Sequence, residues 1–207
     1  NNSFAFHALI FGQAGLLSEK KSFQENYPKK LQKEYQFLSL KFGLKPLEPS
    51  LWKFLRMRPS NFPTIRLAQF TALYHKHRNL MSKLLEISDY QDWEKIFQVK
   101  AEEYWNTHYH FDKKSSSKRV KSMGKRSMHS LMINAAIPLL FYYGKERGND
   151  QLQERAISFL EKIPPEDNSI LQNWSKIGVQ ASSALESQAL IQLKTYHCDS
   201  KNCLNCT

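Results

Sequence analysis

The sequence predicts an all-α protein, an irregular bundle of about eight to ten helices without a substantial sheet. Apolar residues recur at spacings of three and four through most of the chain, which is the period of a helix that buries one face. No segment longer than four residues alternates convincingly between apolar and polar side chains. The 207 residues include only 7 Gly and 8 Pro, whereas a turn-rich β-sandwich would need more of both.

In the first half of the chain, prolines, glycines and capping residues predict the helix boundaries. Pro28 suits the first turn of a helix, and Gly43 suits a left-handed C-cap. Pro63 opens another helix, and Asp89 can cap the next. We therefore expect helices over residues 4–17, 28–42, 50–57, 63–85 with a bend near 79, and 89–104.

The second half begins with a basic, serine-rich segment, residues 113–126, which is expected to be a flexible loop. Residues 131–143 are apolar nearly all round and contain Pro138, which predicts a kinked central core helix. Pro164 and Pro165 end the helix that precedes them. Further helices are expected over residues 151–163, around Trp174, and from about 178 to 196.

The chain is expected to form one helical domain over residues 1–207. It opens Asn-Asn-Ser-Phe, without a methionine or a signal-like segment, which indicates a piece cut from a longer protein. No apolar run approaches the roughly 20 residues that a membrane-spanning helix needs, so no membrane partner is expected. The three cysteines lie within nine residues of one another, which favours a reducing, cytoplasmic setting over a disulfide framework.

Positive charge is the plainest functional signal, since 30 Lys and Arg residues against 19 Asp and Glu give a net charge of +11. Most of this excess lies in residues 113–126, which contain no acid and whose serines can donate to phosphate oxygens. Such a segment binds polyanions by releasing their counterions, which favours a DNA or RNA partner. The alternatives are a solvated linker or a contact with an anionic membrane.

A second basic feature surrounds the stiff loop 58–63. Its arginines lie around a rigid turn that leads into a helix N-terminus, where unpaired N–H groups attract anions. The planar guanidinium fits phosphate, but it can equally pair with carboxylates and pack along core aromatic rings. From both features, the candidate nucleic-acid-binding residues are Arg56, Arg58, Arg66, Lys118, Arg119, Lys121, Lys125 and Arg126.

The C-terminal tail, residues 197–207, contains a candidate metal site. Cys203 and Cys206 have the spacing with which two thiolates hold one ion, and Cys198 can supply a third ligand. Zinc and a [4Fe–4S] cluster each need four ligands. The fourth would come from His197, Asp199, a distant histidine, a partner chain or residues beyond the tail. The alternative is that the three cysteines are free thiols.

Residues 108–112 offer a weaker catalytic signal. If this segment is extended, His108, His110 and Asp112 lie on one side of it and form a metal or acid–base cluster. Histidines in such positions are more often exposed or packing residues. The chain contains neither a Gly-x-Ser-x-Gly elbow nor a glycine loop that cradles phosphate. We therefore assign no catalytic residue, and we do not expect this chain to be an enzyme by itself.

Three segments carry motifs that are specific to one family. Residues 45–66 read Lys-Pro-x-x-Pro-Ser-Leu-Trp-Lys-Phe-Leu-Arg-x-Arg-Pro-x-Asn-Phe-Pro-Thr-Ile-Arg, residues 11–15 read Phe-Gly-Gln-Ala-Gly, and residues 187–194 read Ser-Gln-Ala-Leu-Ile-Gln-Leu-Lys. In these motifs, and over essentially its whole length, the chain resembles the uncharacterised bacterial DUF2851 family. The resemblance implies the C-terminal helical half of a longer protein whose β-rich upstream half suggests a nuclease-like core.

Together these features favour a non-catalytic helical module that binds DNA or RNA, as the accessory half of a nuclease-like protein. Under this interpretation the basic residues contact phosphates, and the cysteine tail holds a structural zinc or an iron–sulfur cluster. The alternative is a helical interaction or structural module without a role in nucleic-acid binding. Such a module would dock on another protein, or on the missing N-terminal half of its own.

Overall fold

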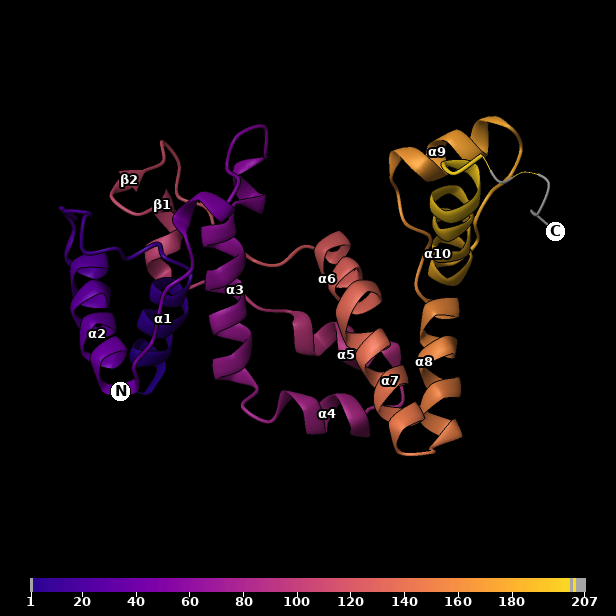
Figure 1. Cartoon of the computed structure of the whole chain (residues 1–207), viewed down its shortest axis with the longest axis horizontal. Helices are drawn as coiled ribbons and strands as arrows, with labels where there is room; N and C mark the ends of the chain where they lie inside the picture. Colours follow the sequence, from indigo (N-terminus) through magenta and orange to yellow (C-terminus); the bar gives the residue numbers. More distant parts are fainter. Residues whose placement is uncertain (1, 202, 204–207) are drawn as a thin grey trace. The chain divides into compact units, whose positions relative to one another are not determined.

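The computed structural model describes residues 2–201 and 203 (Figure 1). The prediction of an all-α fold is confirmed, since within these residues the sheet consists of two short antiparallel strands, β1 (His108–His110) and β2 (Lys113–Lys114). The helices are α1 (Asn2–Gln13), α2 (Asn26–Phe42), α3 (Pro63–Lys76), α4 (Leu80–Glu86), α5 (Tyr90–Phe97), α6 (Lys125–Leu131), α7 (Ile137–Glu146), α8 (Asp150–Lys162), α9 (Ser169–Lys176) and α10 (Ala184–Leu193).

The chain divides into two compact units. The first unit comprises Ile96–Gly124 and the described residues up to Leu80. The second comprises Met81–Lys95 and the described residues from Lys125 onward. Each unit buries large aromatic side chains of its own. That the whole chain folds as one domain stays a prediction.

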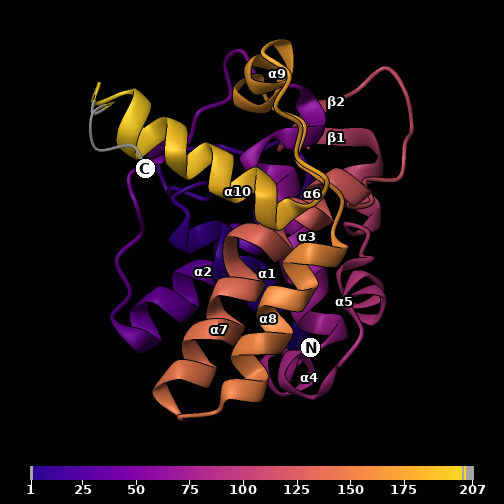
Figure 2. The same ribbon diagram turned by 90° about the vertical axis from the view of Figure 1, so that its right-hand side faces the viewer.

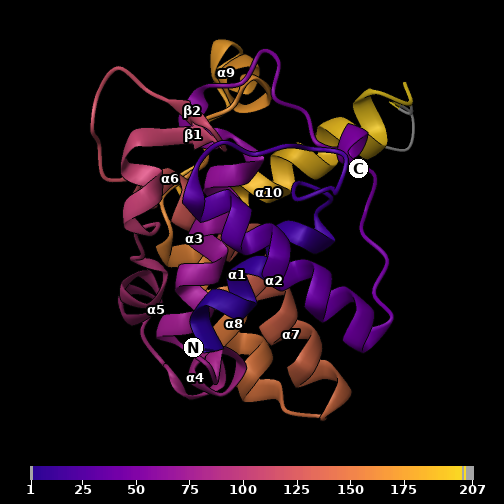
Figure 3. The same cartoon turned by 90° about the vertical axis from the view of Figure 1, so that its left-hand side faces the viewer.

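The first unit is built around aromatic rings. Its helices α1 and α2 lie side by side (Figure 3), and α3 also packs on α1. The Trp105 side chain, on a 3₁₀ turn over Glu103–Thr107, is fully buried and stacks on Phe11 of α1 with 5.3 Å between ring centroids. Phe111, at the end of the β1–β2 hairpin, packs edge-on against Phe11 at 5.2 Å. The hairpin and the helices thus share one core.

The close approach of α1 and α2 depends on glycine. A Cβ atom at Gly12 would lie 2.0 Å from the ring of Tyr35 on α2, and a Cβ at Gly15 would lie 2.2 Å from the backbone oxygen of Leu47. Gly15 also has φ +71°, in the left-handed region that glycine adopts without strain. The Tyr35 hydroxyl accepts a hydrogen bond from the Gln13 amide at 2.8 Å, which ties the two helices together.

Several predicted boundaries in this unit agree with the structure, and one predicted helix is wrong. Gly43 ends α2 with φ +62°, and Pro63 opens α3. Residues 50–57 were expected to be helical, but only Pro49–Leu51 form a single 3₁₀ turn. The chain leaves the helical conformation at Trp52, whose indole Nε1 donates to the Ala14 carbonyl at 2.6 Å, and Arg56 has φ +60°.

The second unit contains the kinked helix predicted from Pro138. Helices α6 and α7 are joined by a π-helical turn over Met132–Ala136, so the helix is continuous through Glu146. Proline lacks an N–H and cannot continue an α-helical ladder, and the wider turn absorbs the missing hydrogen bond. α8 then packs against α7, as Figure 2 shows.

The kinked helix is apolar nearly all round, but it is not buried all round. Its inner face includes Met132, Ile137 and Leu140, whereas Leu139 and Tyr142 are exposed. Elsewhere in this unit, Trp93 of α5 packs edge-on against Phe159 of α8 with 5.0 Å between centroids. The expectation of a helix buried on every side is therefore wrong for its outer face.

The basic segment 113–126 is more ordered than a free loop. After β2, the Ser115 N–H donates to Thr107 and the Arg119 N–H donates to Asn106, both at 2.8 Å. Ser122 pairs with Lys100 in an isolated antiparallel bridge. The segment thus folds back along residues 99–107 before α6 begins at Lys125. Within residues 2–201 and 203, no helix has the length and apolar character required to cross a membrane.

Replacing Gly12 by alanine tests the packing of α1 on α2. Alanine is normally the better helix former, so on propensity alone Gly12→Ala would stabilise the protein. Because the new methyl group would collide with the buried Tyr35 ring, we expect Gly12→Ala to destabilise it by about 1–3 kcal/mol in urea unfolding. Gly124→Ala, where nothing lies within 4 Å of the added Cβ, is the matched control and should change stability by less than about 0.5 kcal/mol.

Candidate functional site

Two basic segments that lie far apart in the sequence meet at one end of the first unit. Phe54 and Phe62 each contact the His110 ring of β1, with centroid distances of 4.7 Å. The Thr64 hydroxyl donates to the Tyr109 carbonyl at 2.6 Å. These contacts hold residues 52–62 against the β1–β2 hairpin, beyond the start of α3 in Figure 1. Residues 52–62 therefore contact the hairpin from which the basic segment 113–126 continues.

We call the exposed cations at this end the basic loop surface. Neither segment contributes a carboxylate to this surface, because no Asp or Glu occurs within residues 49–85 or 113–145. Lys21 is included in this surface, because the positive charges of Lys21 and Lys113 both lower the pKa of His110. None of these cations makes an ion pair within the described part of the chain. The members are Lys21, Lys53, Arg56, Arg58, Lys113, Lys114, Lys118 and Arg119.

Arg66, the third predicted arginine, lies behind this surface and stabilises the loop 58–63 through hydrogen bonds. Its guanidinium is half-buried and donates to the Asn61 side-chain oxygen at 2.8 Å and to the Gln69 side-chain oxygen at 2.9 Å. Burial lowers the pKa of Arg66 from its ordinary value. Arg66 therefore links the loop at Asn61 to the first turns of α3.

Lys121 is placed differently from the surface position that the sequence suggests. It is 5% exposed, and its ammonium donates to the carbonyls of Arg119 at 3.1 Å and Asn106 at 3.3 Å. The same ammonium lies 4.1 Å from the centroid of the Tyr109 ring. A charge held by carbonyls and a ring inside the hairpin is not available to phosphate, so Lys121 is not part of the basic loop surface.

The last two predicted cations, Lys125 and Arg126, belong to the second unit, where they open α6. Both are exposed, and Arg126 forms an ion pair with Asp167. An exposed pair of this kind contributes little to stability and can exchange its partner readily. Of the eight predicted residues, Arg56, Arg58, Lys118 and Arg119 are the exposed cations of the first unit.

No sequence pattern indicates the acid–base pair between α1 and the start of the 3₁₀ turn, in which a buried histidine contacts a partly exposed glutamate. His7 is 1% exposed, and its Nδ1 lies 3.0 Å from the Glu102 carboxylate. The Tyr27 hydroxyl donates to the same carboxylate at 3.2 Å. Burial raises the pKa of Glu102, but His7 and Tyr27 outweigh burial and lower the net pKa. His7 and Glu102 also line a cavity of about 390 Å³, where they could exchange a proton with a bound molecule.

A second buried pair repeats this arrangement. His108 Nε2 lies 3.1 Å from the Glu25 carboxylate, which also accepts from the Tyr104 hydroxyl at 2.8 Å. The Tyr104 ring stacks on His108 at 4.0 Å and on Tyr27 at 4.4 Å, so the two pairs are adjacent. Burial, followed by the neighbouring carboxylate, raises the pKa of both tyrosines, which keeps their hydroxyls as donors. The partners are 75 or more residues apart, too far for any sequence pattern to reveal.

The structure separates the three residues expected to form one cluster over 108–112. A β-bulge interrupts the register between His108 and His110, so their side chains meet different partners. His108 contacts Glu25, whereas His110 packs between Phe54 and Phe62. The Asp112 carboxylate accepts the backbone N–H groups of Gln24 and Glu25. Among the described residues, no group of three or more His, Cys, Asp or Glu side chains could hold a metal ion.

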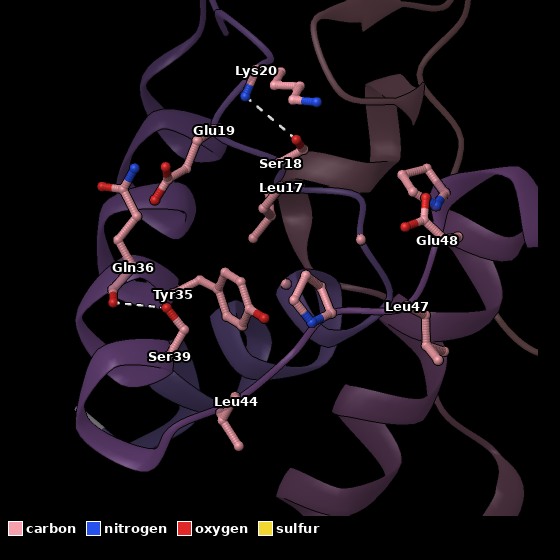
Figure 4. A pocket seen from close by; sticks show the side chains of 14 residues that line it. Leu17, Ser18, Glu19, Lys20, Tyr35, Gln36, Ser39, Leu44, Leu47 and Glu48 are labelled. Carbon is pink, nitrogen blue, oxygen red and sulfur yellow. Dashed lines mark hydrogen bonds between the residues drawn. The ribbon is translucent and has the colours of Figure 1, made fainter.

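A further cavity of the first unit, of about 580 Å³, lies between the end of α1 and α2 (Figure 4). Tyr35 and Leu17 form its apolar wall, and Glu19 and Glu48 carry negative charge at its rim. Lys20 lines the same cavity, so its charged side chains are two carboxylates and one ammonium group. It does not include any predicted site residue.

The cysteine tail is only partly described. Cys198 ends a π-helical turn over Lys194–Cys198, and both Cys198 and Cys203 are exposed free thiols. Cys206 lies outside the described residues. A zinc ion or an iron–sulfur cluster at Cys198, Cys203 and Cys206 stays a prediction.

Comparison with known proteins yields one match. The family model described as "Protein of unknown function (DUF2851)" matches residues 1–169. No curated protein matches the chain, and no solved structure does.

The buried position of Lys121 can be tested by comparing two lysines of the basic segment 113–126. Lys121→Met removes the donor that pairs with two carbonyls, so we expect a loss of about 1–3 kcal/mol in the free energy of unfolding. Lys118→Met, at an exposed position, should change stability by less than about 0.5 kcal/mol. Equal stability of the two variants in urea unfolding would contradict the placement of Lys121.

The stabilising role of Glu102 predicts a pH dependence. Its pKa is lower in the folded state, so the ionised carboxylate stabilises the fold above its ordinary pKa of 4.5, and this stabilisation is lost as the pH falls below that value. We expect Glu102→Gln to be less stable than the natural protein at pH 7, by less than about 1 kcal/mol because Glu102 is partly exposed. The difference should shrink at pH 3, and an equal difference at pH 3 and pH 7 in urea unfolding would contradict this role of Glu102.

Proposed function

The chain belongs to the DUF2851 family, and we propose that it is a non-catalytic helical module that binds DNA or RNA through the basic loop surface. The observation that carries the proposal is the meeting of two acid-free segments at one end of the first unit. Cations gathered without carboxylates repel one another, and a polyanion relieves that repulsion when it binds.

The loops that carry these cations suit contact with a phosphate backbone. Residues 52–62 contain Pro59 and are followed by Pro63, which restrict the backbone, and Phe54 packs on Phe62. Arg56 and Arg58 therefore extend from a loop of fixed conformation. Arg119 and Lys118 follow a hairpin whose backbone is hydrogen-bonded to residues 106–107. Lys and Arg contacts of this kind position a nucleic acid without reading its sequence. We therefore expect strong salt dependence and weak sequence preference.

The metal prediction accompanies this function without being needed for it. The three closely spaced cysteines favour a reducing compartment, and on that ground we propose that the protein is cytoplasmic. In that setting the thiols suit zinc or an iron–sulfur cluster. Elemental analysis and a visible absorption spectrum of anaerobically purified protein distinguish zinc, iron and empty thiols.

A helical interaction module is the second candidate, and exposed apolar side chains on α2 favour it. Phe37 and Leu40 lie one turn apart and are 60% and 86% exposed. Such residues often mark protein contacts when they gather on one face. Under our first proposal this face is not used, so Phe37→Ser with Leu40→Ser should bind nucleic acid as the natural protein does.

Charge reversal tests the basic loop surface directly. We expect the natural protein to bind a labelled single strand or duplex in fluorescence anisotropy with a log–log salt slope of roughly −3 to −5, because four to six cations would each displace counterions. Reversing Arg56, Arg58, Lys118 and Arg119 together to Glu should weaken binding by roughly a hundredfold or more at 50 mM salt.

The matched control reverses Lys33, Lys41, Lys45 and Arg78 to Glu. These four are exposed and carry the same total charge, but they lie on α2 or beyond the distal ends of α2 and α3. This variant should retain most of the affinity. Equal losses in both variants, or binding that does not respond to salt, would contradict the proposed surface.

A further inference from the structure

We propose that the cavity beside the basic loop surface receives an unstacked nucleobase, so that the module binds single strands in preference to duplexes. This inference rests on the proposed function and specifies its ligand. The cavity has a volume of about 380 Å³, which lies within the range of roughly 300–1,000 Å³ typical of small-molecule sites. It is lined by Leu16, Lys21, Ser22, Phe23, Phe54, Thr64, His110, Phe111 and Asp112.

Aromatic rings form much of the cavity lining. Phe54 and His110 are 4.7 Å apart between centroids with their planes inclined at 43°, and both are partly exposed. Phe111 is held edge-on by Phe11 at 5.2 Å and by Phe23 at 5.6 Å. Proteins that bind single strands stack bases on rings of this kind, because every base has an aromatic face.

The charge around the cavity suits an anionic chain whose bases are uncharged. Burial lowers the pKa of His110, and the charges of Lys113 and Lys21 lower it further, so the imidazole is neutral near pH 7. Lys21 contributes to the lining itself, and Arg56 follows two residues after Phe54. Phosphates on either side of a bound base would therefore meet cations.

The polar groups of the cavity are partly engaged and can still bind a base. The Asp112 carboxylate accepts one backbone N–H on each oxygen, from Gln24 at 2.7 Å and from Glu25 at 2.9 Å. Each oxygen keeps a second acceptor site for a base N–H. The Thr64 hydroxyl donates to the Tyr109 carbonyl and can also accept. A carboxylate in this position repels phosphate, so the base and not the backbone is the group that fits the cavity.

A base inside a duplex cannot reach this cavity without leaving its stack, which costs a few kcal/mol per nucleotide. For a single strand this unstacking cost is small, because its bases are already unpaired. The preference for single strands thus follows from the cavity, whereas the basic loop surface alone would bind both forms.

The test compares a labelled single strand, the duplex of the same sequence, and an abasic strand with the same phosphates, using the full chain at one salt concentration. We expect the single strand to bind at least roughly tenfold more tightly than either of the others. A 2-aminopurine placed within the strand should also change its fluorescence on binding, because its base would enter an aromatic site.

Two variants locate the effect. Phe54→Leu keeps an apolar side chain that still packs on His110 and Phe62 and so holds Arg56 and Arg58 in place, but it removes the stacking ring. It should weaken single-strand binding by roughly tenfold without changing the salt slope. Ser22→Phe places a bulky group at an exposed position of the lining, and it should abolish the preference for single strands while the cations remain. Phe37→Leu, at an exposed phenylalanine on α2, is the control and should have no effect.

The outcomes separate this inference from the proposed function. Equal, salt-dependent binding of all three nucleic acids, unchanged by Phe54→Leu and Ser22→Phe, would overturn the nucleobase cavity and leave the basic loop surface in place. An absence of binding to any of them at low salt would overturn both.

Discussion

The packing of Phe54 and Phe62 on His110 is the contact on which the functional end of the first unit depends. The loop that carries these phenylalanines has no extended helix or strand of its own, so its position comes from side-chain contacts. His110 is fixed in turn because β1 leads into Phe111, which packs in the core against Phe11 and Trp105. The placement of Arg56 and Arg58 therefore depends on aromatic residues that are far away in the sequence.

The interior beneath this end combines rings with ionisable groups. Burying a carboxylate or an imidazole alone would be costly, and the fold avoids this cost by pairing His7 with Glu102 and His108 with Glu25. Tyr27 and Tyr104 complete the two pairs and stack on each other. These contacts join α1, the start of α2 and the 3₁₀ turn, so the polar network and the aromatic core stabilise the same elements.

Local signals predicted the helices well where capping or proline chemistry acts within a few residues. Gly43, Pro63 and Asp89 each mark a boundary that the structure contains. The helix expected over residues 50–57 fails because Trp52 bonds to Ala14, a partner that no local pattern specifies. The β1–β2 hairpin was missed because its strands are too short to show alternation. Lys121 lies among other basic residues in the sequence. In the fold, however, its ammonium group contacts the Asn106 carbonyl and the Tyr109 ring.

The sequence by itself determined the all-α class, the family and a surplus of positive charge, since these follow from composition and from patterns within single segments. Only the tertiary structure decided which cations lie together in the open, which one is enclosed, and which rings surround a cavity beside them. The physical reason is that burial and electrostatic environment depend on neighbours contributed by distant segments. Residues 52–62 meet the β1–β2 hairpin because Phe54 contacts His110, and neither segment contains that information alone.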